Sequence, residues 1–464
     1  MSIEKKMLPA DFIARTLALL GGAGAYELLE EALEREAEVS IRLNPDKRPN
    51  QDKKAEGSPG ERVAWCETGY YLPERIAFTF DPLLHAGAYY VQEASSMFVE
   101  QAVKAYVAAP VICLDLCAAP GGKSTHLSSI LPEGSLLVSN EVIRSRANIL
   151  AENLCKWGNP HVIVTRNDPA EIGRLRHFFD LVVADAPCSG EGMFRKDPHS
   201  AGEWSLANVT LCAARQRRIL HDVWDALKPG GLLIYSTCTY NTEENEDNLA
   251  YLIETLGAEP LPVAAHPDWQ VGGALKHPYP ASRFFPHLTR GEGFFLAVVR
   301  KAAAQPGGPS PSKLRKEKRR PPAPIPPEAA RRLLNPENYR LERCGDLLQA
   351  IPLCHSEPYR LLSGQLQLLA SGVCLGAFKG NDLLPTHSLA MSQALNREAF
   401  ASVELSREEA IRYLSREMIP LSGGKGYALA MHQGLPLGFV KLLGNRANNL
   451  YPQEWRIRSR QRNS

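Results

Sequence analysis

The sequence lacks any long apolar stretch. No run in its 464 residues approaches the roughly 18 consecutive apolar residues that a membrane-spanning helix requires. The N-terminal segment MSIEKKMLPADFIARTLALL mixes acidic, basic and apolar residues and has no small-residue cleavage site, which argues against a secretory leader. These absences favour a soluble, cytoplasmic protein without a membrane partner.

The sequence also has little net charge and no regular cysteine pattern. A formal charge of +2 means that a polyanionic partner would have to bind local basic patches. The ten cysteines are irregularly spaced and several fall in predicted strands, so we expect free thiols in a reducing compartment. No Cys/His set has zinc-ligand spacing, and Cys354 and His355 stand together but apart from other ligands. We therefore expect no metal.

The length predicts more than one domain. Residues 1–92 mix helical and extended segments and are expected to form a small N-terminal α+β domain of an RNA-binding type. Residues 93–301 alternate short apolar strands with helices, which predicts an α/β fold with a doubly wound parallel sheet. A Pro-rich stretch with a basic run, residues 302–334, is expected to be a linker, and a strand-rich domain follows at 335–464.

Six apolar segments supply the predicted strands of the middle region. They are VICLDLC, SLLVSNEV, HVIVTRND, FDLVVADAP, GGLLIYSTCTY and GFFLAVVRK. Helices are expected between them, including RSRANILAENLCKWG and CAARQRRILHDVWDALKPGG. The Lys-Pro-Gly-Gly sequence at 228–231 is expected to end the last of these helices.

The stretch LDLCAAPGGKST, residues 114–125, ends like a phosphate-binding P-loop. The P-loop glycine five residues before the Gly-Lys pair is replaced by Cys117, and the dinucleotide pattern GxGxxG is absent. What remains is an acid at the strand end, Asp115, then a small-residue turn and a helix that starts near Lys123. Such a turn suits a ligand lying across the carboxyl ends of parallel strands, and the alternative is a plain connection without a ligand.

Acidic residues end four successive predicted strands: Asp115, Glu141, Asp168 and Asp185. In a doubly wound sheet these positions face one crevice. The spacing of Glu141 from the glycine turn suits hydrogen bonds to ribose hydroxyls, and Asp168 is placed to reach an adenine edge. Any one of the acids could instead cap a helix. Because an acidic rim repels a triphosphate but tolerates a sulfonium, the cofactor that we expect is S-adenosylmethionine rather than ATP.

Two cysteines follow neighbouring predicted strands, Cys188 in DAPCSGEG and Cys238 in YSTCTYNTEEN. Either thiol alone is typical of a buried small hydrophobe, but a strand end beside polar turn residues is where reactive thiolates occur. A thiol beside a methyl donor suits a pyrimidine substrate. A thiolate that adds to carbon 6 makes carbon 5 nucleophilic, an acid such as Asp185 can stabilise the adduct at N3, and a base must then remove the carbon 5 proton.

The segments DLCAAPGGKSTHL, SNE, NDP, DAPCSGEGMFRKDP and YSTCTYNTEENE resemble the successive motifs of the Nol/Nop/Sun family of RNA cytosine-5 methyltransferases. The resemblance covers roughly residues 90–300 and implies a Rossmann-like methyltransferase core. It implies that Cys238 is the nucleophile and that Cys188 assists product release, with Asp185 as the third catalytic residue. Thr239 stands where many members have serine, and both residues carry a hydroxyl. The expected cofactor-binding residues are Asp115, Cys117, Ala118, Ala119, Pro120, Gly121, Gly122, Lys123, Glu141, Asp168 and Asp185.

Two further segments resemble the bacterial RsmF-like branch of the same family. FTFDPLLHAGAYYVQEASSMFVEQAV is similar to the segment that leads into the catalytic domain, and LGFVKLLGNRANNLYPQEWRIR to the PUA-like C-terminal ending of that branch. The branch methylates 16S ribosomal RNA. The resemblance thus implies an enzyme that makes 5-methylcytosine in ribosomal RNA or the small ribosomal subunit. We expect a monomer.

Basic residues near the crevice and in the tail are the candidate RNA contacts. A target base must be single-stranded or flipped out of its stack to be methylated. The candidates are Arg195, Lys196, Arg283, Arg290, Arg456, Arg458, Arg460 and Arg462. The four tail arginines alternate, so a strand there would place them on one face, and the alternative for each cation is a solvated surface charge. Trp204 is expected to pack in the core rather than stack on RNA.

Two rival functions stay open at this point. A tRNA methyltransferase would use the same chemistry, and an RNA-binding ribosome-assembly factor would carry it as a secondary or lost activity. Both Cys188 and Cys238 are present in their motifs, which argues against lost activity. A DNA cytosine methyltransferase fits less well, because that class is expected to use the Pro-Cys thiol as its nucleophile.

Overall fold

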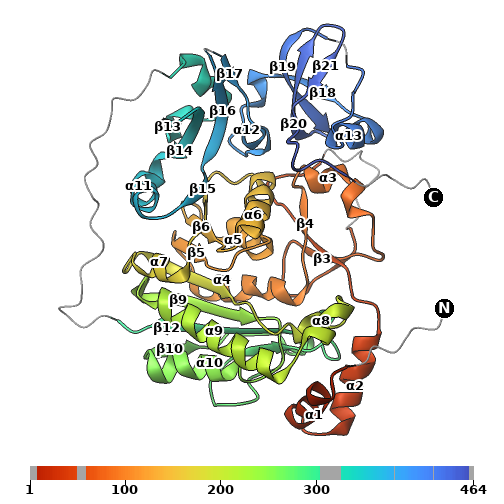
Figure 1. Cartoon of the computed structure of the whole chain (residues 1–464), viewed down its shortest axis with the longest axis vertical. Coiled ribbons are helices and arrows are strands. Elements are labelled where there is room, and N and C mark those ends of the chain that lie inside the picture. Colours follow the sequence, from red (N-terminus) through yellow and green to blue (C-terminus); the bar gives the residue numbers. More distant parts are fainter. Residues whose placement is uncertain (1–7, 50–58, 304–324, 381, 422, 459–464) are drawn as a thin grey trace.

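The apolar segments between residues 111 and 301 pair into one large sheet, seen in the computed structural model of the chain (Figure 1). The structure describes residues 8–49, 59–303, 325–380, 382–421 and 423–458. The strand order is β10-β12-β9-β8-β5-β6-β7-β15, with β11 paired to β12. The central strands β5 to β9 run parallel, which confirms the doubly wound α/β class predicted from the sequence. The bounds are β5 Ile112–Asp115, β6 Leu136–Asn140, β7 Val162–Thr165, β8 Phe179–Asp185, β9 Leu227–Thr237, β10 Ala258–Leu261, β11 Ser282–Phe284, β12 Phe294–Lys301 and β15 Leu368–Ser371.

Helices cover both faces of the sheet because its strands are apolar on both sides. Cys113 of β5 packs in one buried cluster with residues of α4, α5 and α6, whereas its neighbour Leu114 packs in another with residues of α7, α9 and α10. The helix bounds are α4 Val99–Tyr106, α5 Gly122–Ile130, α6 Arg144–Trp157, α7 Pro169–Gly173, α8 Pro198–Glu203, α9 Leu206–Trp224 and α10 Glu246–Ala250. These crossovers leave the carboxyl ends of the parallel strands open at one edge.

The long helix α9 ends earlier than the sequence predicts. It stops at Trp224, and the 228–231 stretch that was expected to end it lies at the start of β9. The pairing of β8 with β9 shifts register after Phe179, and Gly230 has a φ of 78°, which glycine adopts without Cβ strain. The Lys-Pro-Gly-Gly sequence is therefore the bulged beginning of a strand.

The N-terminal part consists of helices and a small antiparallel sheet. α1 Ala10–Leu19 and α2 Ala23–Glu34 lie at one end of the molecule (Figure 1). The sheet has the order β2-β3-β1-β4, with β1 Ser40–Leu43, β2 Glu61–Arg62, β3 Gly69–Tyr71 and β4 Tyr89–Val91, and α3 Pro82–His85 precedes β4. Phe12 of α1 packs edge-on against Phe194 and Trp204, which fixes this helix beside the loop that follows β8.

The C-terminal part contains two four-stranded sheets at the other end of the molecule (Figure 1). The first sheet is β13-β14-β16-β17 and the second is β18-β19-β20-β21, so the prediction of a strand-rich region is correct. The strands are β13 Tyr339–Cys344, β14 Leu347–Pro352, β16 Val373–Lys379, β17 Asp382–Leu384, β18 Ala401–Glu404, β19 Lys425–His432, β20 Leu435–Leu443 and β21 Ala447–Asn449. The helices are α11 Ser356–Gln365, α12 His387–Met391 and α13 Arg407–Leu414.

One strand of the C-terminal part joins the central sheet. β15 pairs antiparallel with β7, with Ser371 opposite Ile163, and so covers the edge of the parallel strands. The sequence did not indicate this pairing, because β15 is a short apolar segment without a pattern that identifies its partner strand. Most of the predicted linker, residues 304–324, lies outside the described residues, and the domain boundaries stay predictions.

Candidate active site

The expected crevice lies where the strand order reverses, beside β5. This strand pairs with β6 on one side and with β8 on the other, so the order of the strands reverses between β5 and β8. Ligands of doubly wound sheets bind at such a switch point. The turn after β5 is tied down by a hydrogen bond from the Ala118 N–H to the Asn140 carbonyl, 2.9 Å. Gly121 precedes α5 with a φ of 116°, which a residue with a Cβ rarely adopts. The residues from Cys117 to Gly122 thus form a fixed small-residue cradle.

Asp115 is a buried acid with one unused oxygen. Its Oδ2 accepts a hydrogen bond from Ser124 Oγ at 2.6 Å, whereas its Oδ1 is buried and has no partner among the described residues. Burial raises the pKa of Asp115 to about 7. An orphaned buried acceptor of this kind fits a ligand with a cationic donor, such as the amino group of an amino acid.

The acids that follow β6 and β7 differ in their surroundings. Glu141 is buried, accepts a hydrogen bond from the Ile143 N–H at 2.9 Å, and has Arg146 3.6 Å from its other oxygen. Asp168 forms a capping box with Glu171 at the start of α7, where its Oδ1 accepts from the Ala170 N–H. The capping explanation therefore accounts for the carboxylate of Asp168, and its contact with a cofactor stays a prediction.

Cys188 and Cys238 meet above the ends of β8 and β9. Their sulfur atoms are 3.0 Å apart, both residues are half-buried, and both are free thiols. The hydrogen bond to the Cys238 sulfur, together with burial, holds the pKa of Cys188 well above its ordinary value. At this distance one thiol can donate its proton to the other sulfur.

Asp185 and Lys123 form an ion pair at the same edge. Asp185 Oδ2 lies 2.9 Å from Lys123 Nζ, and its Oδ1 accepts a hydrogen bond from Ser236 Oγ at 2.7 Å. Lys123 is the second residue of α5, as expected of a helix-start residue, and its Nζ also donates to Ser96 Oγ at 2.9 Å. The lysine thus orients Asp185, a contact that the sequence did not indicate.

A buried glutamate shapes the turn that carries Cys238. Glu191 Oε2 accepts hydrogen bonds from Thr239 Oγ1 at 2.7 Å and from the N–H groups of Tyr240 and Asn241 at 2.7 and 2.9 Å. Trp204 donates to its other oxygen at 3.1 Å and is 6% exposed, so Trp204 belongs to the core as expected. Sequence reasoning missed Glu191, although it stands three residues after Cys188 in the same motif.

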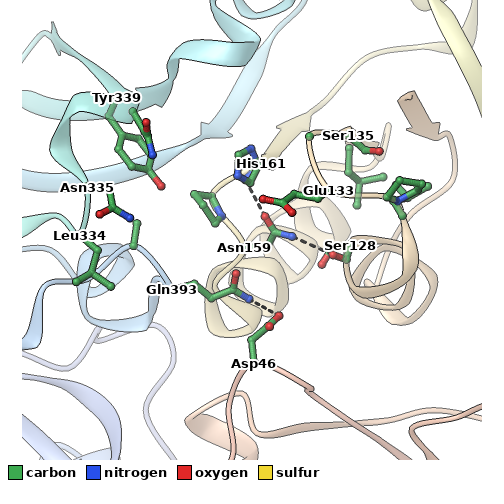
Figure 2. Close-up of a pocket in the computed structure, with 17 residues that line it drawn as sticks. Asp46, Ser128, Glu133, Ser135, Asn159, His161, Leu334, Asn335, Tyr339 and Gln393 are labelled. Atoms are coloured by element: carbon green, nitrogen blue, oxygen red, sulfur yellow. Dashed lines mark hydrogen bonds between the residues drawn. The ribbon is translucent and has the colours of Figure 1, made fainter. Parts of the chain in front are cut away.

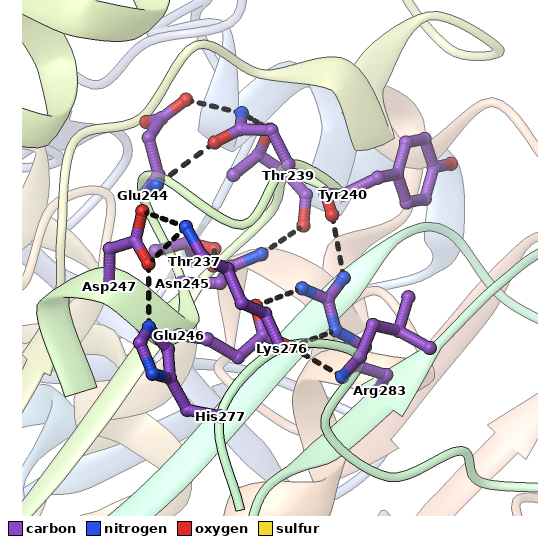
Figure 3. Close-up of polar contacts among 12 residues, drawn as sticks. Thr237, Thr239, Tyr240, Glu244, Asn245, Glu246, Asp247, Lys276, His277 and Arg283 are labelled. Carbon is purple, nitrogen blue, oxygen red and sulfur yellow. Dashed lines mark hydrogen bonds and ion pairs between the residues drawn. The ribbon is translucent and has the colours of Figure 1, made fainter. Parts of the chain in front are cut away.

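A second network holds the far side of this turn (Figure 3). Glu244 accepts hydrogen bonds from the Ser189 N–H at 3.0 Å and from Asn241 Nδ2 at 2.8 Å. Asn245 Nδ2 donates to the Thr239 carbonyl at 3.0 Å, and Arg283 Nη1 donates to the Tyr240 carbonyl at 2.6 Å. The loop after β9 is therefore fixed to the loop after β8 from both sides, which sets the distance between the thiols.

Several of the predicted RNA contacts are engaged in ion pairs. Arg195 is 8% exposed and binds Glu292 through Nε and Nη2 at 3.0 to 3.1 Å, and Arg283 is 1% exposed and binds Glu246. Arg290 pairs with Glu38 and Glu61. Burial of the first two guanidinium groups argues against the phosphate contacts expected of Arg195 and Arg283.

The remaining candidate cations lie nearer to the surface. Lys196 and Arg458 are exposed, and Arg456 is half-buried and donates to the Gln453 carbonyl. The expected tail strand does not form over the described residues 451–458, and Arg460 and Arg462 lie outside them. Across the described ranges, no helix has the length and apolarity needed to cross a bilayer.

Three family models match consecutive parts of the chain. Residues 8–94 match the N-terminal domain of 16S rRNA methyltransferase RsmF, residues 109–300 match 16S rRNA methyltransferase RsmB/F, and residues 400–457 match the methyltransferase RsmF PUA domain. Ribosomal RNA small subunit methyltransferase F of Enterobacter sp. (strain 638) is 30% identical over 98% of this chain and 97% of its own. The protein of that name from Salmonella arizonae is 31% identical over 98% of both chains.

Solved structures from Pyrococcus horikoshii share the central fold. A methyltransferase homolog protein is 29% identical, with a TM-score of 0.54 over 63% of this chain and 95% of its own. NSun6 with SFG is 20% identical, with a TM-score of 0.55 over 64% of this chain and 100% of its own, which shows the fold alone. The Rossmann-like methyltransferase core, the N-terminal domain and the C-terminal PUA domain predicted from the sequence are confirmed.

Proposed function

The chain belongs to the RsmF family of 16S rRNA methyltransferases, and from that premise we propose that it makes 5-methylcytosine through a covalent bond between Cys238 and the base. The observation that carries the proposal is the approach of Cys188 and Cys238 to 3.0 Å beside Asp185. Two thiols at the ends of neighbouring parallel strands, with Asp185 three residues before Cys188, suit nucleophilic addition to a pyrimidine.

The first step is the addition of Cys238 to the substrate. The Cys238 thiolate forms a bond with carbon 6 of cytosine, and the electron pair of the 5,6 double bond moves to carbon 5. Asp185 supports this step by donating a hydrogen bond from its protonated carboxyl group to N3, where negative charge develops, and Lys123 together with Ser236 holds that group in place. Carbon 5 then carries the nucleophilic electron pair.

S-adenosylmethionine supplies the methyl group that carbon 5 accepts. The buried free oxygen of Asp115 fits its amino group, the turn from Cys117 to Gly122 fits its methionine part, and Glu141 fits its ribose hydroxyls. Asp168 would contribute from its position at the N-cap of α7. These residues would bind and orient the donor, and an acidic rim tolerates its positive sulfonium.

Cys188 acts in the release of the product. While Cys238 is a thiolate, the proton of Cys188 is held in the hydrogen bond between the two sulfurs. Once Cys238 is bonded to carbon 6, that negative charge is gone, the pKa of Cys188 falls, and its proton can leave to solvent. The Cys188 thiolate then accepts the carbon 5 proton, the bond between carbon 6 and Cys238 breaks, and Cys238 leaves as a thiolate.

The substrate that we propose is 16S rRNA or the small ribosomal subunit, bound with the help of the PUA domain. Methyl transfer to purified small subunits, naked 16S rRNA and tRNA separates this assignment from the tRNA alternative. Transfer to tRNA alone would overturn the substrate, and leave the chemistry intact. Binding of RNA without methyl transfer to any of the three would support the assembly-factor alternative instead.

The chemistry is tested by trapping the covalent adduct. Wild type, Cys238→Ala and Cys188→Ala are incubated with S-adenosylmethionine and ribosomal RNA and run on a denaturing gel. We expect Cys188→Ala to accumulate a shifted protein–RNA band, and Cys238→Ala to give neither the band nor methylation. Cys344→Ser, an exposed cysteine in the C-terminal part, is the matched control and should behave as wild type. Methylation by Cys238→Ala would show that the nucleophile is assigned wrongly.

A further inference from the structure

Two histidines from distant parts of the chain lie in contact at the amino end of β7 in the central sheet. His161 stands just before β7, and His355 ends the short 3-10 helix Leu353–His355 that precedes α11. The Nδ1 atom of His161 lies 3.0 Å from the Nε2 atom of His355, although 194 residues separate them in sequence. Cys354 adds a third donor, because one ligand atom from each of these residues lies within 4.8 Å of the others.

We propose that His161, Cys354 and His355 bind a zinc-like divalent cation. The sequence placed Cys354 and His355 apart from other ligands, and the fold brings His161 to them. Two imidazole nitrogens and one thiolate are a donor set that favours zinc over calcium or magnesium, which prefer oxygen ligands. Such a set leaves a fourth tetrahedral position for water or a carboxylate.

The surroundings of the three residues suit a metal ligand set. His355 is buried and its ring also hydrogen-bonds the backbone of Ser135, the kind of outer contact that orients a ligating histidine. Cys354 is exposed, which leaves an entry path for the ion.

Beside the cluster lies a polar cavity of about 480 Å³ that is lined by His161 but not by Cys354 or His355 (Figure 2). His161 lines this cavity together with Glu133 and Ser135, and the Glu133 carboxylate acts electrostatically on the His161 ring. Tyr339 and Asn335 of the C-terminal part line its other side. A cation bound by His161, Cys354 and His355 would join the amino end of β7 to the segment that leads into α11. It would thereby fasten the C-terminal part to the central sheet.

A second cluster of similar composition shows what a closed set looks like. Cys66, Glu100 and His126 also bring three donor atoms together, but all three are buried. Lys104 donates to Glu100 Oε1 at 2.7 Å, and His126 Nε2 lies 2.9 Å from its other oxygen. Lys104 thus already supplies a positive charge to the Cys66, Glu100 and His126 cluster, whereas the cluster of His161, Cys354 and His355 contains no carboxylate.

The test uses the untagged full chain after treatment with a chelator, titrated with Co²⁺ as a spectroscopic stand-in for Zn²⁺. We expect one Co²⁺ per chain with a thiolate-to-cobalt charge-transfer band, displaced by Zn²⁺, and a higher melting temperature with Zn²⁺. Cys354→Ser should lose that band and weaken binding by about tenfold or more, and His161→Ala should weaken binding similarly. Cys344→Ser, which changes another exposed cysteine of the C-terminal part, should keep both the band and the affinity.

The catalytic thiols are a competing site, so the titration is repeated with Cys238→Ala, in which the band should persist. Failure of wild type to bind Co²⁺, or an unchanged band in Cys354→Ser, would overturn the proposal and leave only a histidine–histidine hydrogen bond. Cys354 is exposed, so its replacement by serine should not impair folding even if His161→Ala does. Neither result depends on methyl transfer.

Discussion

The sulfur atoms of Cys188 and Cys238 lie 3.0 Å apart, although 50 residues separate the two cysteines in sequence. Their meeting follows from the register of β8 and β9, in which Asp185 pairs with Ser236. Cys188 then stands three residues beyond the end of β8 and Cys238 directly after the end of β9, and two glutamates, Glu191 and Glu244, fix the loops that carry them. The distance is thus set by hydrogen bonds that the thiols do not make themselves.

Oxidation of this pair is expected to inactivate the enzyme. Hydrogen peroxide takes two hydrogens from the thiols of Cys188 and Cys238, which become a disulfide as the peroxide is reduced to water. Methyl transfer should be lost and then restored by dithiothreitol, and mass spectrometry of peptides should show the Cys188–Cys238 link. Cys188→Ala should yield no such link, and Cys344→Ser should behave as wild type. Reversible inactivation without the link would contradict this expectation.

Replacement of Glu191 is expected to misplace Cys238. Glu191→Gln puts an amide donor where Thr239 Oγ1 and two backbone N–H groups donate, so we expect a loss of about 1 to 3 kcal/mol in the free energy of unfolding. The adduct should form more slowly, with lower kcat and little change in the KM for S-adenosylmethionine. Glu203→Gln, an exposed residue nearby, is the control and should change neither quantity. An unchanged rate of adduct formation would show that Glu191 does not position the nucleophile.

Asp115 is expected to make the stability of the free protein depend on pH. Its pKa is about 7 in the folded chain and 3.8 in the reference state, so the folded protein holds a proton that the unfolded chain has released. The stabilisation is complete below about pH 4 and is lost as the pH rises to about 7. Chemical unfolding at several pH values should show this slope, and Asp115→Asn should remove it.

Asp115 is also expected to make cofactor affinity depend on pH, with affinity rising as the pH rises. A cationic amino group pairs with ionised Asp115, so affinity for S-adenosylmethionine should fall by about tenfold per pH unit below 7 and level off above it. Calorimetry on wild type and Asp115→Asn checks this, with weaker and pH-independent binding expected for the variant. Equal affinity for wild type from about pH 5.5 to 8 would mean that Asp115 does not contact the cofactor.

Arg195 and Lys196 are neighbours with different expected roles. Arg195→Ala removes the hydrogen-bonded partner of buried Glu292, which keeps only Lys196 at 3.9 Å, and should cost about 3 to 5 kcal/mol of stability, with little effect on the salt dependence of RNA binding. Lys196→Ala should keep the melting temperature and reduce the slope of log affinity against log salt by about 0.7 to 0.9. A reduced salt slope in Arg195→Ala, with an unchanged slope in Lys196→Ala, would show that Arg195 contacts phosphate.

The parallel strands could be predicted because their signal is local. Strands β5 to β9 are short apolar runs that end in polar residues, and the side chains Asp115, Asp185 and Cys238 follow from that register. The end of α9 was predicted wrongly, since glycines that end a helix also permit a strand bulge. Sequence alone distinguishes these two uses only when the partner strand is known.

Contacts between distant segments could not be predicted in this way. The carboxylate of Glu191 and the guanidinium of Arg195 look like surface charges in sequence, and each is buried by a partner from another loop. His161 and His355 carry no spacing that links them. Such pairs form through tertiary packing, and a local stretch of sequence carries no information about them.

The pairing of β15 with β7 has a consequence for the order of synthesis. The edge of β7 stays uncovered until residue 371 has left the ribosome, long after the strands that carry Cys188 and Cys238 are complete. An open edge is prone to pair with other chains. A nascent or truncated chain that stops before β15 is therefore exposed to aggregation, and the catalytic sheet is protected only in chains that have also made the segment leading into the C-terminal part.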